Sequence, residues 1–231
     1  MEKYQVITPL VPVRSEPRDP AEQVTQFLYG EQVEVLEEHA QWRRCRSMQD
    51  GYEGWLDSKM IGEIQLGEYL VKSPMKAVSL PSGVKVVPAG SRIAEELGET
   101  KLESISQVAK MFLGAPYLWG GKSIMGIDCS GLTQVASQLV GIQLPRDARD
   151  QAQVGEEIPF ADLAEENDLA FFDNEDGNII HVGVILENDV QRFIIHAAGE
   201  VRIDRFDHQG IFREDQQRYT HKLRIIRRVN G

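Results

Sequence analysis

The spacing of apolar residues changes once along this chain, near residue 101, and that change limits the possible folds more than any other feature. Before it, short alternating stretches are separated by turn signals, as in EQVEVLEE (31–38), WRRCRSM (42–48) and YEGWLD (52–57). No stretch there has convincing helical spacing. We therefore predict a small β-barrel over residues 1–65. A connecting segment rich in Ser, Pro and Gly follows over residues 66–100, with one or two strands.

Helical spacing begins at residue 101. It runs through TKLESISQVAKMFLGAP to stop signals at Gly114 and Pro116, and it returns after Cys129 until Gly141 and Pro145. Strand-like runs follow: LAFFD (169–173), IIHVGVILE (179–187), RFIIHAAG (192–199) and KLRIIRRV (222–229). Two helices followed by strands joined through short turns predict an α+β domain with an antiparallel sheet over residues 101–231.

The composition excludes several classes of partner. A formal net charge of -11 argues against nucleic acid, because neutralising phosphates requires a basic face. The start MEKYQVITPLVPVRSEP has no apolar signal region, and nowhere do about 18 apolar residues run together. We therefore expect a cytoplasmic protein that uses no membrane. We also expect a monomer. The two cysteines, Cys45 and Cys129, are too few for a disulfide framework or a Cys-rich zinc site, and Cys45 lies in a predicted strand as a structural thiol.

Cys129 is the first candidate for chemistry, because it lies in GIDCSGL at the start of the second predicted helix. Unpaired backbone N–H groups and the helix macrodipole favour an anion there, so we expect a lowered thiol pKa. Asp128 and Ser130 flank the thiol, and YLWGG (117–121) precedes it. A structural cysteine would not need these neighbouring polar and aromatic residues. A buried, packed thiol is nevertheless the commoner role for a cysteine before an amphipathic helix.

A nucleophile needs a base, and among five histidines His181 is the one centred in a predicted strand whose flanking Val182, Val184 and Leu186 point to the other face. Its face of the strand carries Gly183 and Ile185, and the glycine would leave open space beside the imidazole. His196 takes the equivalent place in the next run. If the two strands pair, the rings can be neighbours, and His196 could orient His181 as in acyl-transfer enzymes.

Two structural alternatives compete with this interpretation. A histidine in a strand is often only a satisfied core residue. Zinc could in principle bind His181, His196, Cys129 and Asp128, but no ligand pair with short spacing such as CxxC or HxxxH supports a metal site. We therefore expect neither a metal nor a cofactor.

The blocks GAPYLWGGKSIMGIDCSGLTQ, LPRDARDQ, DLAFFD, HVGVIL and IIHAAG together resemble the NlpC/P60 cysteine peptidases, papain-like enzymes that cut bacterial cell-wall peptides. The resemblance covers roughly residues 101–231. The stretches VPVRSEP, QFLYGEQVEVLEEHAQWRRCR and YEGWL resemble a bacterial SH3 domain. The whole arrangement is similar to the cytoplasmic peptide-recycling members, the γ-D-glutamyl-L-diamino acid endopeptidases.

The resemblance implies site residues. It makes Cys129 the nucleophile, His181 the base and His196 the orienting residue. It further implies that Tyr117 helps to stabilise the oxyanion, that Trp119 forms a wall of the pocket, and that Asp128 and Ser130 line the pocket for the substrate's amino-terminal dipeptide.

In the recycling members the SH3 domain closes one end of the cleft, so that only peptides with a free amino-terminal L-Ala fit. Glu22 and Tyr52 are the candidates for this role, because a carboxylate facing an ammonium group would select a free amine. One position departs from the family: Ala148 stands after LPRD, where many relatives have a serine.

The implied reaction is hydrolysis of the γ-D-glutamyl-L-diamino acid bond of a murein tripeptide or tetrapeptide through a thioester. An amidase or another murein hydrolase acting on the intact wall is the alternative within the superfamily, since fold does not fix reaction. The acyltransferase-like members place the histidine before the cysteine, unlike this chain. A wall-binding module without catalysis is a further alternative, against which the intact Cys129, His181 and His196 argue.

Overall fold

A computed structural model describes residues 2–65, 67–80, 83–95, 101–187 and 191–229. The chain divides into two compact units. The first comprises Met1–Lys101 together with Leu118–Gly126, and the second comprises Leu102–Tyr117 together with Ile127–Gly231. The chain therefore leaves the first unit, returns to it for nine residues (118–126) and leaves it again.

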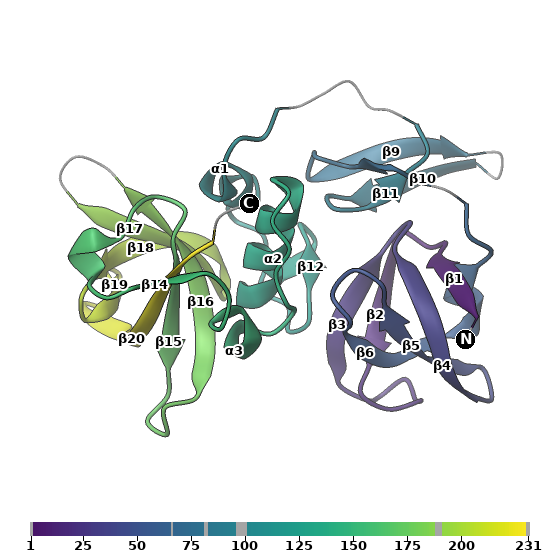
Figure 1. Cartoon of the computed structure of the whole chain (residues 1–231), viewed down its shortest axis with the longest axis horizontal. Coiled ribbons are helices and arrows are strands. Elements are labelled where there is room, and N and C mark those ends of the chain that lie inside the picture. Colours follow the sequence, from purple (N-terminus) through teal and green to yellow (C-terminus); the bar gives the residue numbers. More distant parts are fainter. Residues whose placement is uncertain (1, 66, 81–82, 96–100, 188–190, 230–231) are drawn as a thin grey trace. The chain divides into compact units, whose positions relative to one another are not determined.

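The first unit is built around an SH3-like sheet whose strands follow closely along the chain (Figure 1). Its strands are β1 (Lys3–Val6), β2 (Leu10–Arg14), β3 (Gln23–Leu28), β4 (Gln32–His39), β5 (Trp42–Ser47), β6 (Glu53–Asp57) and β7 (Ile61–Gly62), with the 3-10 turn η1 (Ser58–Met60) before β7. The sheet order is β3-β2-β6-β5-β4-β1-β7, and the neighbouring strands pair antiparallel.

Alternation explains why these segments become strands, because one side of each faces a shared core. That core contains Val6, Val11, Val13, Phe27, Val33, Cys45 and Leu56. Cys45 is fully buried, and burial raises the pKa of its thiol to about 12, as expected for a structural cysteine.

The segment predicted as a connection (66–100) contributes further strands to the first unit. They are β8 (Tyr69–Leu70), β9 (Met75–Leu80), β10 (Gly83–Pro88) and β11 (Arg92–Ile93). β9 pairs with β10 and β8 with β11. A small apolar cluster of Val71, Val78, Val87 and Ile93 holds them together.

The second unit begins with helices. They are α1 (Ile105–Lys110), α2 (Cys129–Leu139) and α3 (Ala148–Gln151), and a short turn η2 (Ala161–Leu163) follows. Ser104 caps α1, since its side chain accepts a hydrogen bond from the backbone N–H of Gln107. The helix is shorter than the apolar spacing suggests: Phe112 is buried in the turn that follows it, whereas Leu113 is exposed.

The strands of the second unit close into a barrel (Figure 1). They are β14 (Glu156–Ile158), β15 (Leu169–Asp173), β16 (Ile179–Glu187), β17 (Arg192–Ala198), β18 (Glu200–Asp207), β19 (Gly210–Arg213) and β20 (Arg218–Arg228). Their order is β14-β20-β15-β16-β17-β18-β19, and β19 additionally pairs with β20. The α+β class is confirmed. The closure was not predicted, because β18 and β19 carry charged residues within their alternating pattern.

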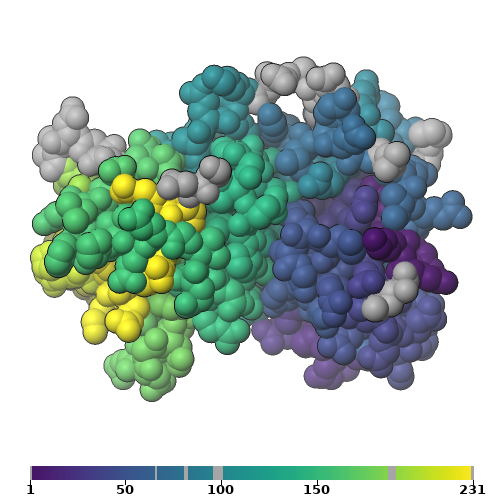
Figure 2. Space-filling view, viewed as in Figure 1, coloured from purple at the N-terminus to yellow at the C-terminus, as the bar shows by residue number. Residues whose placement is uncertain are grey.

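The barrel is filled by alternate residues of its strands. They include Ala170, Phe172, Ile185, Ile194, Phe206, Ile211 and Ile226. The space-filling view shows yellow atoms of the C-terminal strand among green atoms of the same unit (Figure 2). None of the described helices is long and apolar enough to cross a membrane.

Candidate active site

Cys129 is the first residue of α2, and Asp128 caps this helix. The backbone of Asp128 is extended, with φ -96° and ψ 177°, and its Oδ1 accepts a hydrogen bond of 2.6 Å from the N–H of Gly131. The Cys129 sulfur also accepts hydrogen bonds from the backbone N–H groups of Ser130 and Val182. Val182 is the residue next to His181 in β16. The sequence thus correctly places Cys129 at a helix start, beside the strand that carries His181.

A buried ion pair holds this helix start. Arg146 donates from Nη2 to Asp128 Oδ2 over 2.6 Å and from Nη1 to the Ser130 hydroxyl over 2.8 Å. The side chains of Arg146 and Asp128 are only 2% and 7% exposed. The sequence analysis did not predict a role for Arg146, although LPRDARDQ contains it. Only Ala148 was singled out in that stretch. Ala148 begins α3.

The thiol pKa is opposite to the sequence-based expectation. Burial is the largest effect and the Asp128 carboxylate the next, and together they raise the pKa of Cys129 to about 12. The helix N–H groups and Arg146 lower it but do not outweigh burial. The prediction of a preformed low-pKa thiolate is therefore wrong, and Cys129 is a thiol in the resting protein.

Tyr117 lies beside this thiol. Its N–H donates to Gly199 O over 2.9 Å, and it forms a parallel bridge with Ile127, two residues before Cys129. Burial and the neighbouring Cys129 and Asp128 raise the pKa of the Tyr117 phenol to about 12. The phenol is thus a neutral O–H donor next to the nucleophile.

His181 and His196 come from paired strands and share a hydrogen bond. β16 and β17 are antiparallel, with Gly183 opposite His196. His181 Nε2 lies 2.8 Å from His196 Nδ1. His181 is 6% exposed and His196 fully buried, and burial is the largest cause that lowers the pKa of both rings. Both are therefore neutral near pH 7.

Gly183 has a different role from the predicted one. A Cβ at this position would lie 2.7 Å from two side-chain carbons of Ile194 and 2.9 Å from the carbonyl oxygen of Ile195. The place is therefore filled rather than open. Glycine is required here because β17 packs directly against the β16 backbone.

Two further residues complete the histidine cluster, and the sequence analysis named neither. Asp204 Oδ2 lies 3.0 Å from His196 Nε2 on the side away from His181. The His221 ring stacks on the His181 ring, with centroids 4.2 Å apart and planes at 25°. Burial is the main cause that lowers the pKa of His221 to about 4, so this ring is also neutral.

The other predicted binding residues lie in the first unit. Trp119 Nε1 donates to Glu22 Oε1 over 2.7 Å, and Gln23 Nε2 donates to the Trp119 carbonyl over 2.9 Å. Gly120 has a φ of +74°, and a Cβ there would lie 2.8 Å from Gln23 O, so the YLWGG segment needs a glycine to approach β3. Tyr52 is half-buried before β6, where its N–H donates to Asp50 Oδ1 over 3.0 Å.

No group of three or more His, Cys, Asp or Glu side chains among the described residues has an arrangement that could hold a metal ion. Among the four residues considered as possible zinc ligands, Asp128 and the two histidines have other hydrogen-bond partners. Asp128 pairs with Arg146, whereas His181 and His196 pair with each other.

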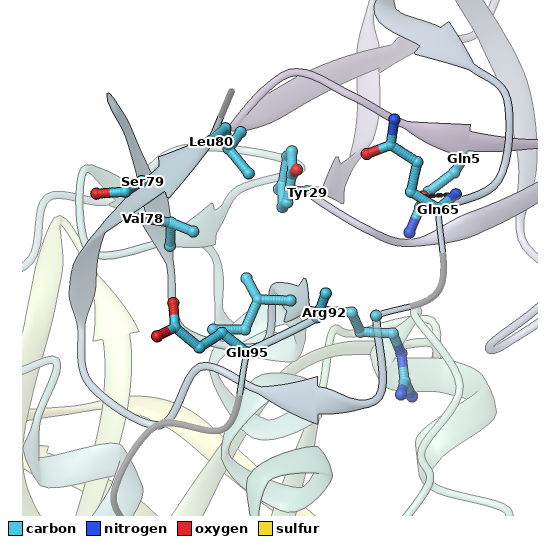
Figure 3. Close-up of a pocket in the computed structure, with 11 residues that line it drawn as sticks. Gln5, Tyr29, Gln65, Val78, Ser79, Leu80, Arg92 and Glu95 are labelled. Carbon is cyan, nitrogen blue, oxygen red and sulfur yellow. Dashed lines mark hydrogen bonds between the residues drawn. The ribbon is translucent and has the colours of Figure 1, made fainter. Parts of the chain in front are cut away.

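Each unit contains at least one cavity lined by its own residues alone. In the first unit, a cavity of about 90 Å³ is lined by residues including Gln5, Tyr29, Gln65 and Arg92 (Figure 3). It contains no candidate for catalysis. In the second unit, a cavity of about 800 Å³ includes His221 among its lining residues and so adjoins the histidine cluster.

Comparison with known proteins finds a family match in each half of the chain. Residues 114–222 match the NlpC/P60 family, and residues 13–61 match the bacterial dipeptidyl-peptidase SH3 domain. The chain is 30% identical over 202 residues to the γ-D-glutamyl-L-lysine dipeptidyl-peptidase of Bacillus subtilis, covering 69% of this chain and 68% of that protein. A protein of the same name from Bacillus cereus is 24% identical over 214 residues, covering 70% of this chain and 64% of that protein.

A solved NlpC/P60 family protein from Bacillus cereus has a similar fold, with a TM-score of 0.74 over 99% of both chains at 20% identity. The fold and these relatives define a peptidase with a papain-like α+β domain and a bacterial SH3 domain. The chain belongs to the NlpC/P60 family.

Proposed function

We propose that this protein is a cysteine endopeptidase that hydrolyses the γ-D-glutamyl-L-diamino acid bond of murein peptides with a free amino-terminal L-Ala. The observation that carries the proposal is the 2.8 Å hydrogen bond between His181 and His196, beside a cysteine at a helix start. The names of the two Bacillus relatives support the substrate class. The cytoplasmic location and the recycling role stay predictions.

Cys129 starts the reaction as a thiol. His181 takes the Sγ proton as sulfur attacks the γ-carbonyl carbon of D-Glu, and the electron pair of the C=O bond moves to oxygen. The N–H groups at the start of α2 and the Tyr117 hydroxyl are the donors available to that oxyanion. A raised phenol pKa suits this role, because Tyr117 must keep its proton to donate.

The imidazolium then returns the proton. His181 protonates the leaving α-amine of the diamino acid, the C–N bond breaks and a thioester remains. Water attacks the thioester carbonyl while His181 takes one of its protons, the C–S bond breaks, and His181 returns that proton to the departing sulfur. The products are L-Ala-D-Glu with a free γ-carboxyl group and the free thiol. Lowered histidine pKa values match this cycle, because the base must be neutral at the outset.

The diamino acid leaves next to His181. The cavity of about 800 Å³ that shares His221 carries side chains of both charge signs, among them Asp173, Glu175 and Lys222. A zwitterionic diamino acid needs partners of both signs, and the volume falls within the range typical of ligand sites. We therefore place the leaving group on this side of the base.

The free-amine requirement is assigned to Glu22 and Tyr52, with Trp119 as a pocket wall. Trp119 fixes one oxygen of Glu22 and leaves the carboxylate its negative charge for an ammonium group. Asp128 and Ser130 stay candidates for contacts with the dipeptide. Their bonds to Arg146 indicate that they also hold the start of α2 in place.

The test compares L-Ala-γ-D-Glu-L-Lys, its diaminopimelate counterpart and the N-acetylated form of each, with products followed by mass spectrometry. We expect cleavage of the free-amine peptides only, no cleavage by Cys129→Ala, and retained cleavage by Cys45→Ala as the matched control. Activity that survives in Cys129→Ala would remove this residue from its role. Cleavage of intact wall but not of the peptides would favour the wall-hydrolase alternative, and wall binding without any cleavage would favour the binding module.

Glu22→Gln tests the gate separately. The amide oxygen of glutamine can still accept from Trp119 Nε1, so the local structure should persist while the charge is lost. We expect weaker discrimination against acetylated peptides. An unchanged preference for the free amine would contradict the assignment.

A further inference from the structure

Behind His196 lies a carboxylate that the proposed mechanism does not use. Asp204 is in β18, which pairs with β17 so that Ile194 lies opposite Asp204 and His196 opposite Arg202. Asp204 is 6% exposed, and its Oδ2 is 3.0 Å from His196 Nε2. A hydrogen-bonded chain therefore runs from His181 through His196 to Asp204.

Asp204 is held as an anion. Burial opposes its ionisation, but the hydrogen bonds from His196 and Arg202 outweigh burial and lower the pKa of the carboxyl to about 2. Arg202 donates from Nε to Oδ2 over 2.6 Å and from Nη2 to Oδ1 over 2.8 Å. This two-point contact fixes the plane of the carboxylate as well as its charge.

An ionised carboxylate only accepts hydrogen bonds, so the His196 nitrogen that faces it must carry a proton. A neutral His196 then has its lone pair on Nδ1, which accepts from Nε2–H of His181. The same reasoning leaves the lone pair of neutral His181 on Nδ1. One carboxylate thus decides which nitrogen is basic in both rings.

We propose that Asp204 is a positioning residue that sets the tautomers of His196 and His181, so that Nδ1 of His181 is the atom that takes the proton from Cys129. The proposal rests on the proposed function for the last step only. The tautomers themselves follow from the geometry and exist whether or not the substrate has been identified.

Asp204 also affects the charge that forms during the reaction. When His181 becomes an imidazolium, the chain through His196 links that charge to the carboxylate. Among the residues that the structure describes, the other charged or titratable groups that affect the pKa of these rings include Arg202, Arg213 and His221, and Asp215 contacts both arginines. Asp204 is the anion hydrogen-bonded to His196, so its loss lowers the pKa of the base.

The first experiment needs no variant and no substrate. Nitrogen-15 NMR of the wild-type histidine side chains near pH 7.5 distinguishes the two neutral tautomers. We expect protons on Nε2 of both His181 and His196, and no Nδ1–H form of either. A His196 ring protonated on Nδ1 would overturn the proposal, even if every candidate peptide proved to be uncleaved.

The second experiment uses Asp204→Asn. An amide can present either its oxygen or its NH₂ group to His196, so the ring no longer holds one tautomer. We expect kcat/KM to fall roughly ten- to a hundredfold, with KM little changed. This is the range typical of residues that hydrogen-bond to a functional histidine and fix its orientation and tautomer. The acid limb of the kcat/KM profile should move to lower pH.

Asp215→Asn is the matched control, because it removes a carboxylate that contacts Arg202 but leaves both the His196–Asp204 hydrogen bond and the Asp204–Arg202 ion pair. We expect this variant to keep most of the activity and the wild-type tautomers. Equal losses in both variants, with an unmoved pH profile and unchanged histidine spectra, would mean that Asp204 only stabilises the fold and would overturn the proposal.

Discussion

Removing the positive charge of Arg146 while Asp128 stays in place tests how the start of α2 is held. The pair is 2.6 Å apart, with side chains 2% and 7% exposed, so water cannot replace the missing partner. Breaking such a buried pair from one side costs about 3–5 kcal/mol, because it leaves an uncompensated charge. Arg146→Met should therefore destabilise the second unit by about that amount, a large share of a typical domain's stability.

The partner variant is Asp128→Ser. Serine is a good N-cap, so the hydrogen bond to the Gly131 N–H can be kept while the carboxylate is lost. This variant should also cost about 3–5 kcal/mol, now because the buried Arg146 loses its carboxylate partner. Combining both changes removes both charges, and the double variant should be more stable than either single variant. A coupling free energy of about 3 kcal/mol or more is expected.

The measurement must report on the second unit alone. All three tryptophans, Trp42, Trp55 and Trp119, belong to the first unit, so fluorescence would follow the wrong part of the chain. Hydrogen exchange of the α2 amides, measured by mass spectrometry on the full chain, avoids this problem. The expected loss speeds exchange by roughly two to three and a half orders of magnitude, since each 1.4 kcal/mol is tenfold. An unfolding free energy of Arg146→Met within about 1 kcal/mol of the wild-type value would refute the reasoning. It would show that the buried Asp128 carboxylate does not need the positive charge of Arg146.

Two other predictions concern packing and pH. Gly183→Ala should destabilise the second unit by about 1–3 kcal/mol, because the new Cβ would overlap Ile194 and the Ile195 carbonyl; unchanged α2 exchange would contradict this. Stability should fall as pH falls from about 6.5 towards 4, because folding lowers the pKa of His181, His196 and His221, the last to about 4, so the unfolded chain binds more protons there. His221→Phe should reduce the slope of unfolding free energy against pH, and an equal slope would remove His221 from this effect.

The sequence predicted the elements whose residue pattern and packing agree. LAFFD and IIHVGVILE correspond to β15 and β16 residue for residue, because apolar side chains continue along both. The helix start at Cys129 was predicted from the regular apolar spacing that follows it, and the structure adds that Asp128 caps this helix. His181 and His196 could be proposed as neighbours because each is centred in a recognisable strand.

The sequence analysis did not predict the residues of β18 that place charged side chains on the inward side of the strand. In EVRIDRFD, Arg202, Asp204 and Phe206 share one side of β18, and the first two are tolerated there because they pair with each other. Alternation alone does not reveal such a pair. The thiol pKa was mispredicted because the helix start indicates N–H donors but not the depth at which Cys129 is buried.

The discontinuous first unit has a practical consequence for anyone who divides this chain into fragments. Residues 118–126 hydrogen-bond to β3 and to the residue before it. Trp119 Nε1 donates to Glu22, Gln23 donates to the Trp119 carbonyl, and the Lys122 N–H donates to Gln26 Oε1 over 2.8 Å. A catalytic fragment that starts at Leu102 would carry these residues without the strand that satisfies them. An expression boundary drawn where the sequence pattern changes would therefore cut through a folded unit, and the shortest fragment that preserves these bonds must include β3.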